Sequence, residues 1–144
     1  MTVLIDSNVM IDFLKGNKNA IEHIKNIISG NVPIFISIIS IYEIYIGIIA
    51  NLYSKAGRPS KVPELLNYYE KFLIKCGILD FTRESVEKAA DIFIQSQGKG
   101  LSVKKKDCQI AGIALINGIS EVLTRDKEDF LKIFNLTGLK FKSY

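Results

Sequence analysis

TVLIDSNVMIDFL, residues 2–14, joins a short apolar run directly to a helix-forming segment. The β-branched residues at positions 2–5 have the composition of a buried strand. Asp6, Ser7 and Asn8 follow at once, and their side chains can accept hydrogen bonds from the free N–H groups that begin a helix. A strand that passes straight into a helix is typical of α/β proteins, in which parallel strands alternate with helices.

The same alternation continues along the rest of the chain. Short apolar runs predict further strands at residues 34–36, 78–81 and 121–124, with an edge strand at 139–141. Apolar residues at helical spacing predict helices over residues 19–29, 64–75 and 82–97, from Ser40, from about residue 105, and after Asp126. We therefore predict one domain over residues 1–144, an α/β fold in three α/β/α layers with a four- to five-stranded, mostly parallel sheet.

The segment after the second strand supports two local predictions. Ser40 stands where a helix N-cap is expected, and Glu43, three residues later, occupies the second position of a capping box. Residues 51–63 mix Gly, Pro and Ser with Lys and Arg, which predicts a basic loop. On this interpretation the capping box alone accounts for Glu43.

The composition indicates a cytoplasmic globular protein with a basic bias. Hydrophobic residues make up 48% of the chain and charged residues 24%, which excludes a disordered or collagen-like class. Nineteen Lys and Arg against fifteen Asp and Glu give a net charge of +4, which suits a polyanionic partner without requiring one. We expect no signal peptide, because residues 1–10 have no basic region ahead of a long apolar stretch. We also expect no membrane span, because the most apolar stretch carries Glu43 at its middle. Cys76 and Cys108 have no metal-ligand spacing, so we expect reduced core thiols.

Four carboxylates stand where a parallel sheet gathers its ligands, beyond the carboxyl ends of its strands. Asp6 ends the first strand, Asp126 follows the fourth, and Glu43 and Asp107 lie near the starts of two helices. Each residue alone also fits a structural role as a helix cap or a partner of a helix dipole. Together they would repel one another unless basic groups, raised pKa values or a bound cation compensated. Oxygen ligands without His or Cys favour Mg²⁺ or Mn²⁺.

Four segments of the chain resemble the motifs of the PIN-domain nucleases and, more narrowly, those of VapC-type toxins of toxin–antitoxin pairs. They are, in family order, LIDSN at residues 4–8, SIYEIYIG at 40–47, DCQIA at 107–111 and TRDKEDF at 124–130. The resemblance implies a central first strand and a catalytic metal site formed by Asp6, Glu43, Asp107 and Asp126. It also implies supporting positions near these acids: the polar Ser7, Asn8 and Thr124, and the additional acid Asp129.

The function implied by this resemblance is a Mg²⁺- or Mn²⁺-dependent endoribonuclease that a small antitoxin protein neutralises. We expect Asp6 and Asp107 to be the principal ligands of one or two ions, with the other two acids binding directly or through water. The apolar helix around residues 41–49 predicts a homodimer. The lysines that lead into the third motif would contact the RNA backbone: Lys99, Lys104, Lys105 and Lys106.

Three alternatives stay open on the sequence alone. The chain could be a PIN-domain nuclease that processes RNA without being a toxin, or a catalytically inactive PIN-like module that binds RNA or serves as a scaffold. A receiver or haloacid-dehalogenase-like phosphotransfer domain also places Asp at the end of its first strand. The dehalogenase pattern has a second Asp two residues later, where this chain has Asn8. His23 lies outside all these motifs, so we expect no His general base.

Overall fold

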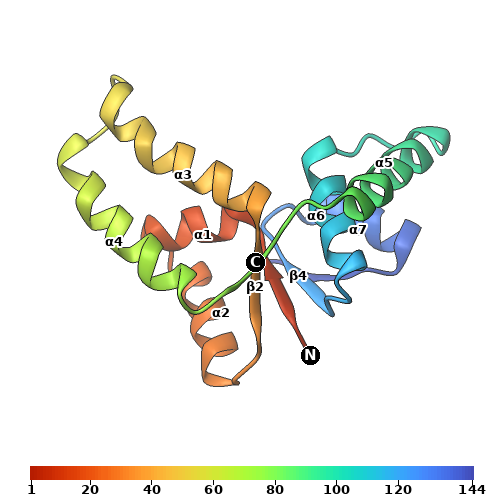
Figure 1. Cartoon of the computed structure of the whole chain (residues 1–144), viewed down its shortest axis with the longest axis horizontal. Coiled ribbons are helices and arrows are strands. Elements are labelled where there is room, and N and C mark those ends of the chain that lie inside the picture. Colours follow the sequence, from red (N-terminus) through yellow and green to blue (C-terminus); the bar gives the residue numbers. More distant parts are fainter.

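The computed structural model describes residues 1–144 and consists of five strands and seven α-helices (Figure 1). In chain order the elements are β1 (Val3–Ile5), α1 (Ser7–Leu14), α2 (Lys18–Ser29), β2 (Ile34–Ser37), α3 (Ile38–Tyr53), a 3-10 helix (Pro59–Lys61), α4 (Val62–Leu73), β3 (Gly77–Leu79), α5 (Arg83–Gly98), α6 (Lys105–Ile116), β4 (Glu121–Leu123), α7 (Lys127–Thr137) and β5 (Lys140–Lys142). None of the helices is long and apolar enough to cross a membrane.

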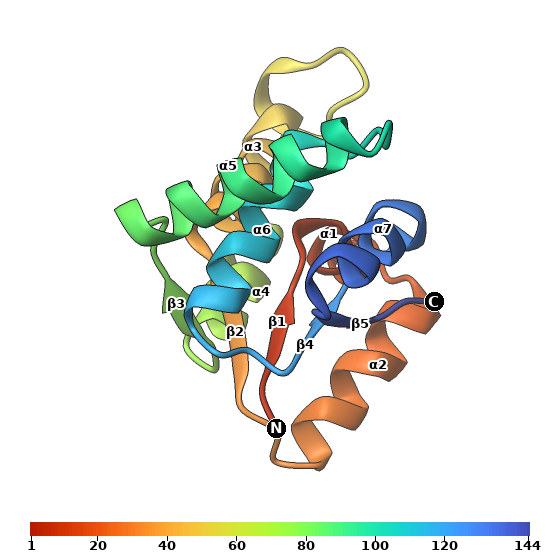
Figure 2. The same ribbon diagram turned by 90° about the vertical axis from the view of Figure 1, so that its right-hand side faces the viewer.

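All five strands are parallel and form one sheet with the order β3-β2-β1-β4-β5 (Figure 2). The central strand is β1, in which Ile5 pairs with Ile36 of β2 on one side and Leu123 of β4 on the other. Because every strand runs the same way, all carboxyl ends lie along one edge of the sheet, which we call the carboxyl edge. The predicted parallel sheet and its central first strand are confirmed.

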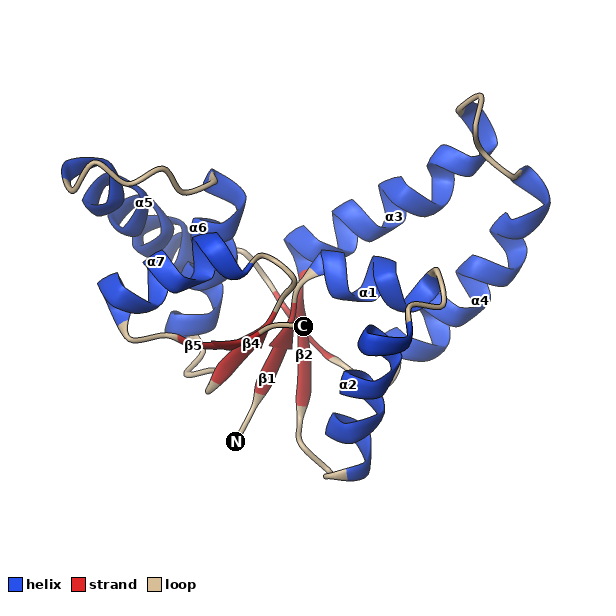
Figure 3. Cartoon of the chain, turned by 180° about the vertical axis from the view of Figure 1, so that it is seen from behind, coloured by secondary structure: helices blue, strands red, loops and turns tan.

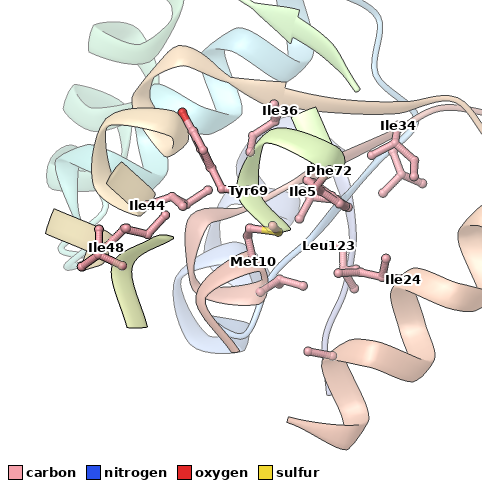
Figure 4. Packing of buried hydrophobic residues seen from close by; sticks show 14 residues of the cluster. Ile5, Met10, Ile24, Ile34, Ile36, Ile44, Ile48, Tyr69, Phe72 and Leu123 are labelled. Carbon is pink, nitrogen blue, oxygen red and sulfur yellow. The ribbon is translucent and has the colours of Figure 1, made fainter. Parts of the chain in front are cut away.

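Helices cover both faces of the sheet, which gives the predicted three layers (Figure 3). Side chains alternate along β1, so that Val3 and Ile5 face helices α1–α4 while Leu4 faces helices α5–α7. Figure 4 shows the first of these two cores, where Met10, Ile44 and other apolar side chains of the helices pack on the strands. A sheet buried on both faces explains why the strands are apolar at nearly every position.

The prediction that Ser40 caps the helix after the second strand is wrong. That helix, α3, begins at Ile38, and its N-cap is Ser37, whose Oγ accepts a hydrogen bond from the backbone N of Ser40 at 3.0 Å. Ser37 also donates from its hydroxyl to Ser40 Oγ, so the two serines form one buried pair. Glu43 therefore lies about one and a half turns into α3, with its side chain free for contacts outside the helix.

The basic loop predicted at residues 51–63 is shorter than expected. Helix α3 continues to Tyr53, and Pro59–Lys61 forms a 3-10 turn that leads into α4. Asn51 holds the connection together, because its Oδ1 accepts from the backbone N of Arg58 at 3.2 Å. Residues 54–58 alone therefore remain as an irregular link between the two helices.

Candidate metal centre

Asp6 and Thr124 lie at the carboxyl edge, directly after the neighbouring strands β1 and β4, and both are completely buried. Asp6 caps helix α1: its Oδ1 accepts from the backbone N of Ser7 at 2.7 Å. Its Oδ2 accepts from the hydroxyl of Thr124 at 2.8 Å. Thr124 Oγ1 in turn accepts from the backbone N of Asp126 at 3.0 Å. One short chain of hydrogen bonds therefore fixes the first and fourth motifs relative to each other.

Asp107 is the unusual carboxyl group of the site. Helix α6 leads into β4 and so begins at the carboxyl edge, where Asp107 in its first turn is completely buried. Neither of its side-chain oxygens has a hydrogen-bond partner, although buried polar atoms nearly always have one. Burial, followed by the neighbouring acids Asp126 and Asp6, raises the pKa of Asp107 from 3.8 to about 9. Without a cation this group is therefore protonated at neutral pH.

Asp126 and Asp129 face Asp107 from the start of helix α7. Asp126 is the N-cap of α7, and its Oδ1 accepts from the backbone N of Asp129 at 3.3 Å. One oxygen from each of the three carboxyl groups can be chosen so that all lie within 4.8 Å of one another. Lys104 closes this group, donating from Nζ to Asp126 at 2.7 Å and from its backbone N to Asp129 at 2.9 Å. Partial burial raises the pKa of Asp126, but the protonated carboxyl group of Asp107 and the ammonium group of Lys104 outweigh it and lower the pKa overall.

Glu43 and Lys106 complete the site on the side of α3. The Nζ atom of Lys106 lies 3.5 Å from Oε1 of Glu43 and 3.9 Å from Oδ1 of Asp6. The hydroxyl of Ser7 donates to the same Glu43 oxygen at 3.1 Å. Burial lowers the pKa of Lys106, but Asp6 and Glu43 raise it overall, so its ammonium group stays charged. Lys106 is thus a cation placed between two of the four predicted acids.

Hydrogen bonds through Ser7 and Thr124 connect Asp6 with Glu43 and Asp126, and Asp107 lies near Asp126 and Asp129 without a hydrogen bond of its own. Asn8 joins the network by accepting from the backbone N of Arg125 at 3.1 Å. Two of the four predicted RNA-binding lysines lie outside the acidic group: Lys99 is exposed, and the ammonium group of Lys105 lies 5.4 Å from the ring centre of Phe93. His23 lies on α2 with its Nδ1 against the carbonyl of Asn19.

A second polar network beside the site was not predicted from the sequence. The nearly buried Asp12 accepts from Nη1 of Arg125 at 2.7 Å and from the hydroxyl of Tyr144 at 2.9 Å. Asp12 therefore holds Arg125, which precedes Asp126, and links Tyr144 at the end of the chain to α1. No local signal could have found this network, because its members are 113 and 132 residues apart from Asp12 in the chain.

The donor set fits a hard divalent cation. Asp107 brings two buried oxygens without partners, and Asp126 and Asp129 bring further carboxylate oxygens close to it. Mg²⁺ and Mn²⁺ prefer carboxylate oxygens, whereas Zn²⁺ sites usually contain His or Cys. A cation that replaced the proton of Asp107 would also satisfy its orphaned oxygens.

Comparisons with known proteins agree with this fold. The PIN domain family matches residues 3–134 of the chain. No curated protein matches it in sequence. The VapBC2 structure of Rickettsia felis, bound to a promoter DNA fragment, is similar with a TM-score of 0.77 and 19% identity over 100% of this chain and 99% of that chain.

Two further solved structures are similar over nearly their whole length. FitAcB of Neisseria gonorrhoeae has a TM-score of 0.79 and 21% identity over 97% of this chain and 96% of that chain. VapBC-5 of Mycobacterium tuberculosis, a member of the VapBC family of toxin–antitoxin systems, has a TM-score of 0.70 and 16% identity over 100% of both chains. The TM-scores show a shared fold. The matched residues 3–134 include all four acidic motifs. The chain belongs to the PIN domain family.

Proposed function

We propose that the chain is a Mg²⁺- or Mn²⁺-dependent endoribonuclease that hydrolyses RNA phosphodiester bonds. The observation that carries this proposal is Asp107, a completely buried carboxyl group without hydrogen-bond partners that faces Asp126 and Asp129. Such a group is costly unless a cation binds it. Asp6 and Glu43 extend the acidic group, and with Asp107 and Asp126 they form the proposed catalytic quartet.

The chain's own groups prepare the site for a phosphodiester. A divalent ion held by these acids would supply the activation of a water molecule as the nucleophile and the stabilisation of charge on the leaving oxygen. Asp6 is held in one orientation by Ser7 and Thr124, so little reorganisation is needed during the reaction. Lys104 and Lys106 place two ammonium groups among the acids. They reduce the repulsion between these acids and the phosphates of the RNA.

Substitution of Asp6 tests this function. Asp6→Asn removes one negative charge while preserving volume, and we expect the rate of Mg²⁺- or Mn²⁺-dependent cleavage of single-stranded RNA to fall at least about 100-fold. The matched control is Asp80→Asn, which removes an exposed acid that follows the edge strand β3. The control should cleave RNA at the wild-type rate. Equal cleavage by Asp6→Asn and wild type would remove the central role of the acidic site.

We further propose that the lysines before and within the first turn of α6 contact the RNA backbone. Lys99, Lys104 and Lys105 are exposed, and Lys106 lies at the acids themselves. Contacts of this kind position a phosphate backbone without reading its sequence. RNA binding should therefore weaken as the salt concentration rises.

The biological setting that we propose is a toxin–antitoxin pair with a small antitoxin protein as partner. This rests on the similarity to structures that are described as VapBC complexes or systems. A groove of about 510 Å³ between α1, α3 and α4 could receive an amphipathic segment of the partner, since both apolar and basic side chains line it: Ile11, Ile48, Leu65, Lys15 and Lys61. Expression of the chain should arrest growth, and coexpression of the partner should relieve the arrest. Active ribonuclease without growth arrest would favour an RNA-processing enzyme instead.

We also propose that the chain forms a homodimer through α3. Three large side chains of this helix are substantially exposed: Tyr42, Tyr45 and Ile46. An exposed apolar face of this kind favours association. Sedimentation should give a dimer for the wild-type chain and a monomer for Ile46→Lys. A wild-type monomer at all concentrations would contradict the proposal.

A further inference from the structure

We propose that the ammonium group of Lys106 takes the place of a second divalent cation, so that the site binds a single Mg²⁺ or Mn²⁺ ion. This inference rests on the proposed metal-dependent function and deepens it. Lys106 Nζ lies 3.5 Å from Oε1 of Glu43 and 3.9 Å from Oδ1 of Asp6, two acids outside the cluster of Asp107, Asp126 and Asp129.

The acidic group divides into two halves: one contains carboxyl oxygens without partners, and in the other each carboxylate has a partner. In the first half, Asp107, Asp126 and Asp129 bring oxygens within 4.8 Å of one another, and both oxygens of Asp107 lack a partner. In the second half, Asp6 and Glu43 already have partners: Asp6 accepts from Ser7 and Thr124, Glu43 accepts from Ser7, and Lys106 pairs with both. In the first half Lys104 donates to Asp126 and Asp129, so Asp107 is the carboxyl group left without a partner, and only its half calls for an added cation.

The position of Lys106 makes its ammonium group a fixed component of the site. It directly precedes Asp107 in the first turn of α6, so the helix that presents the unpartnered carboxyl group also presents the lysine. Its side chain is 31% exposed, whereas that of Lys104 is 69% exposed and lies at the rim. A divalent ion bound between Asp6 and Glu43 would have to displace this ammonium group and would then be repelled by it.

A lysine in this position contributes charge without adding a second Lewis acid. Its ammonium group can offset the negative charge that develops on a phosphate during hydrolysis. It cannot activate a second water molecule as a divalent ion does. Glu43 then contributes to the site by holding Lys106, and the single ion is held by the half of the site that contains Asp107.

Counting bound ions tests the inference. Chelator-treated full-length chain is titrated with Mn²⁺, and the number of bound ions is measured by calorimetry and by electron paramagnetic resonance. We expect one ion in the wild-type chain and in Lys106→Arg, and two in Lys106→Met. The matched control is Lys105→Met, which removes the neighbouring ammonium group that lies over Phe93. This control should bind one ion.

A second variant keeps the test decisive if Lys106→Met does not fold. Glu43→Gln weakens the lysine's half of the site only, so it should still bind one Mn²⁺ with an affinity within a few-fold of wild type, whereas Asp126→Asn should lose the ion. Two ions in the wild-type chain, one ion in folded Lys106→Met, or loss of the ion in Glu43→Gln would each overturn the inference. No bound ion in the wild-type chain would overturn the proposed metal centre itself, which distinguishes the two failures.

Discussion

Thr124 is the residue that links the first and fourth motifs. Its hydroxyl donates to Asp6 and accepts from the backbone N of Asp126, and the Asn8 amide approaches it at 3.5 Å. A group that orients a ligand typically changes metal affinity by about 10- to 100-fold when it is lost. Thr124 therefore acts as a positioning residue.

Substitution of Thr124 by Val preserves the shape of the side chain and removes its hydroxyl. We expect the affinity for Mn²⁺ to fall by about 10- to 100-fold, because Asp126 loses the hydroxyl oxygen that accepts from its backbone N and fixes its position. Thr124→Ser retains the hydroxyl and should restore most of the affinity. Equal Mn²⁺ affinities of Thr124→Val and wild type, measured by calorimetry, would show that the hydroxyl does not position the site.

The raised pKa of Asp107 predicts how the stability of the ion-free chain depends on pH. Its folded-state pKa of about 9 lies above the ordinary value of 3.8, so between these values the native chain binds a proton that the unfolded chain has lost. Unfolding then releases a proton, and this group's contribution to the free energy of unfolding falls as the pH rises through that window. Asp107→Asn cannot titrate, so its stability relative to wild type should increase as the pH rises.

Urea denaturation of both chains in the presence of chelator, at several pH values within this window, measures the difference. A difference in unfolding free energy that does not change with pH would contradict the raised pKa. Addition of Mn²⁺ should stabilise the wild-type chain more than the variant, because ligands that bind only the native state raise its stability.

Some site residues can be predicted from the sequence and others cannot. Asp6 directly follows β1 and Asp126 lies shortly after the end of β4, so parallel-sheet geometry alone places both at the carboxyl edge. Asp129 has a weaker signal: it lies three residues after the cap Asp126, which brings both to the start of α7. The ion pairs of Lys106 depend on how α6 is rotated against α3, and no local pattern encodes that rotation.

At the scale of elements, helix α6 carries Asp107 and is positioned by close packing on α5. A Cβ atom added at Gly112 of α6 would lie 2.7 Å from the carbonyl oxygen of Ser85 and 2.9 Å from the backbone N of Ala89. These contacts are with backbone atoms of α5, which cannot move aside as a flexible side chain can. Gly112 therefore lets the two helices approach closely.

Gly112→Ala should destabilise the chain by about 1–3 kcal/mol, the usual cost of overpacking a core. The matched control is Gly47→Ala in α3, where an added Cβ meets nothing within 4 Å. This control should gain about 0.5–1 kcal/mol, because Ala favours a helix more than Gly does. Chemical denaturation measures both changes. Equal effects of the two substitutions would contradict the close approach of α5 and α6.

The order and type of the elements follow from the sequence, because apolar periodicity and turn residues mark each of them. The start of α3 does not, because both Ser37 and Ser40 are good N-caps and the sequence does not distinguish them. The strand ending at Ser37 leads straight into the helix, so the earlier serine caps it and the later one pairs with it. This shift of three residues moves Glu43 out of the capping box and leaves it available to Ser7 and Lys106.

At the scale of the whole molecule, the charge is divided between a basic body and an acidic site. Five of the fifteen acids gather at the carboxyl edge together with Lys104 and Lys106, so the rest of the chain carries seventeen Lys and Arg against ten Asp and Glu. The net charge of +4 therefore understates the basic character of the surface outside the site. This arrangement suits a polyanion that is drawn to the surface and cleaved where a cation binds the acids.

The most direct test of the account is the ion dependence of RNA cleavage by the purified chain. Chelator-treated wild-type chain and Asp107→Asn are each incubated with a labelled single-stranded RNA, with and without added Mg²⁺ or Mn²⁺. We predict cleavage by the wild-type chain only when the ion is present, and a rate at least about 100-fold lower for Asp107→Asn. Cleavage that persists without a divalent ion, or that Asp107→Asn performs at the wild-type rate, would contradict a metal-dependent ribonuclease built on this carboxyl group.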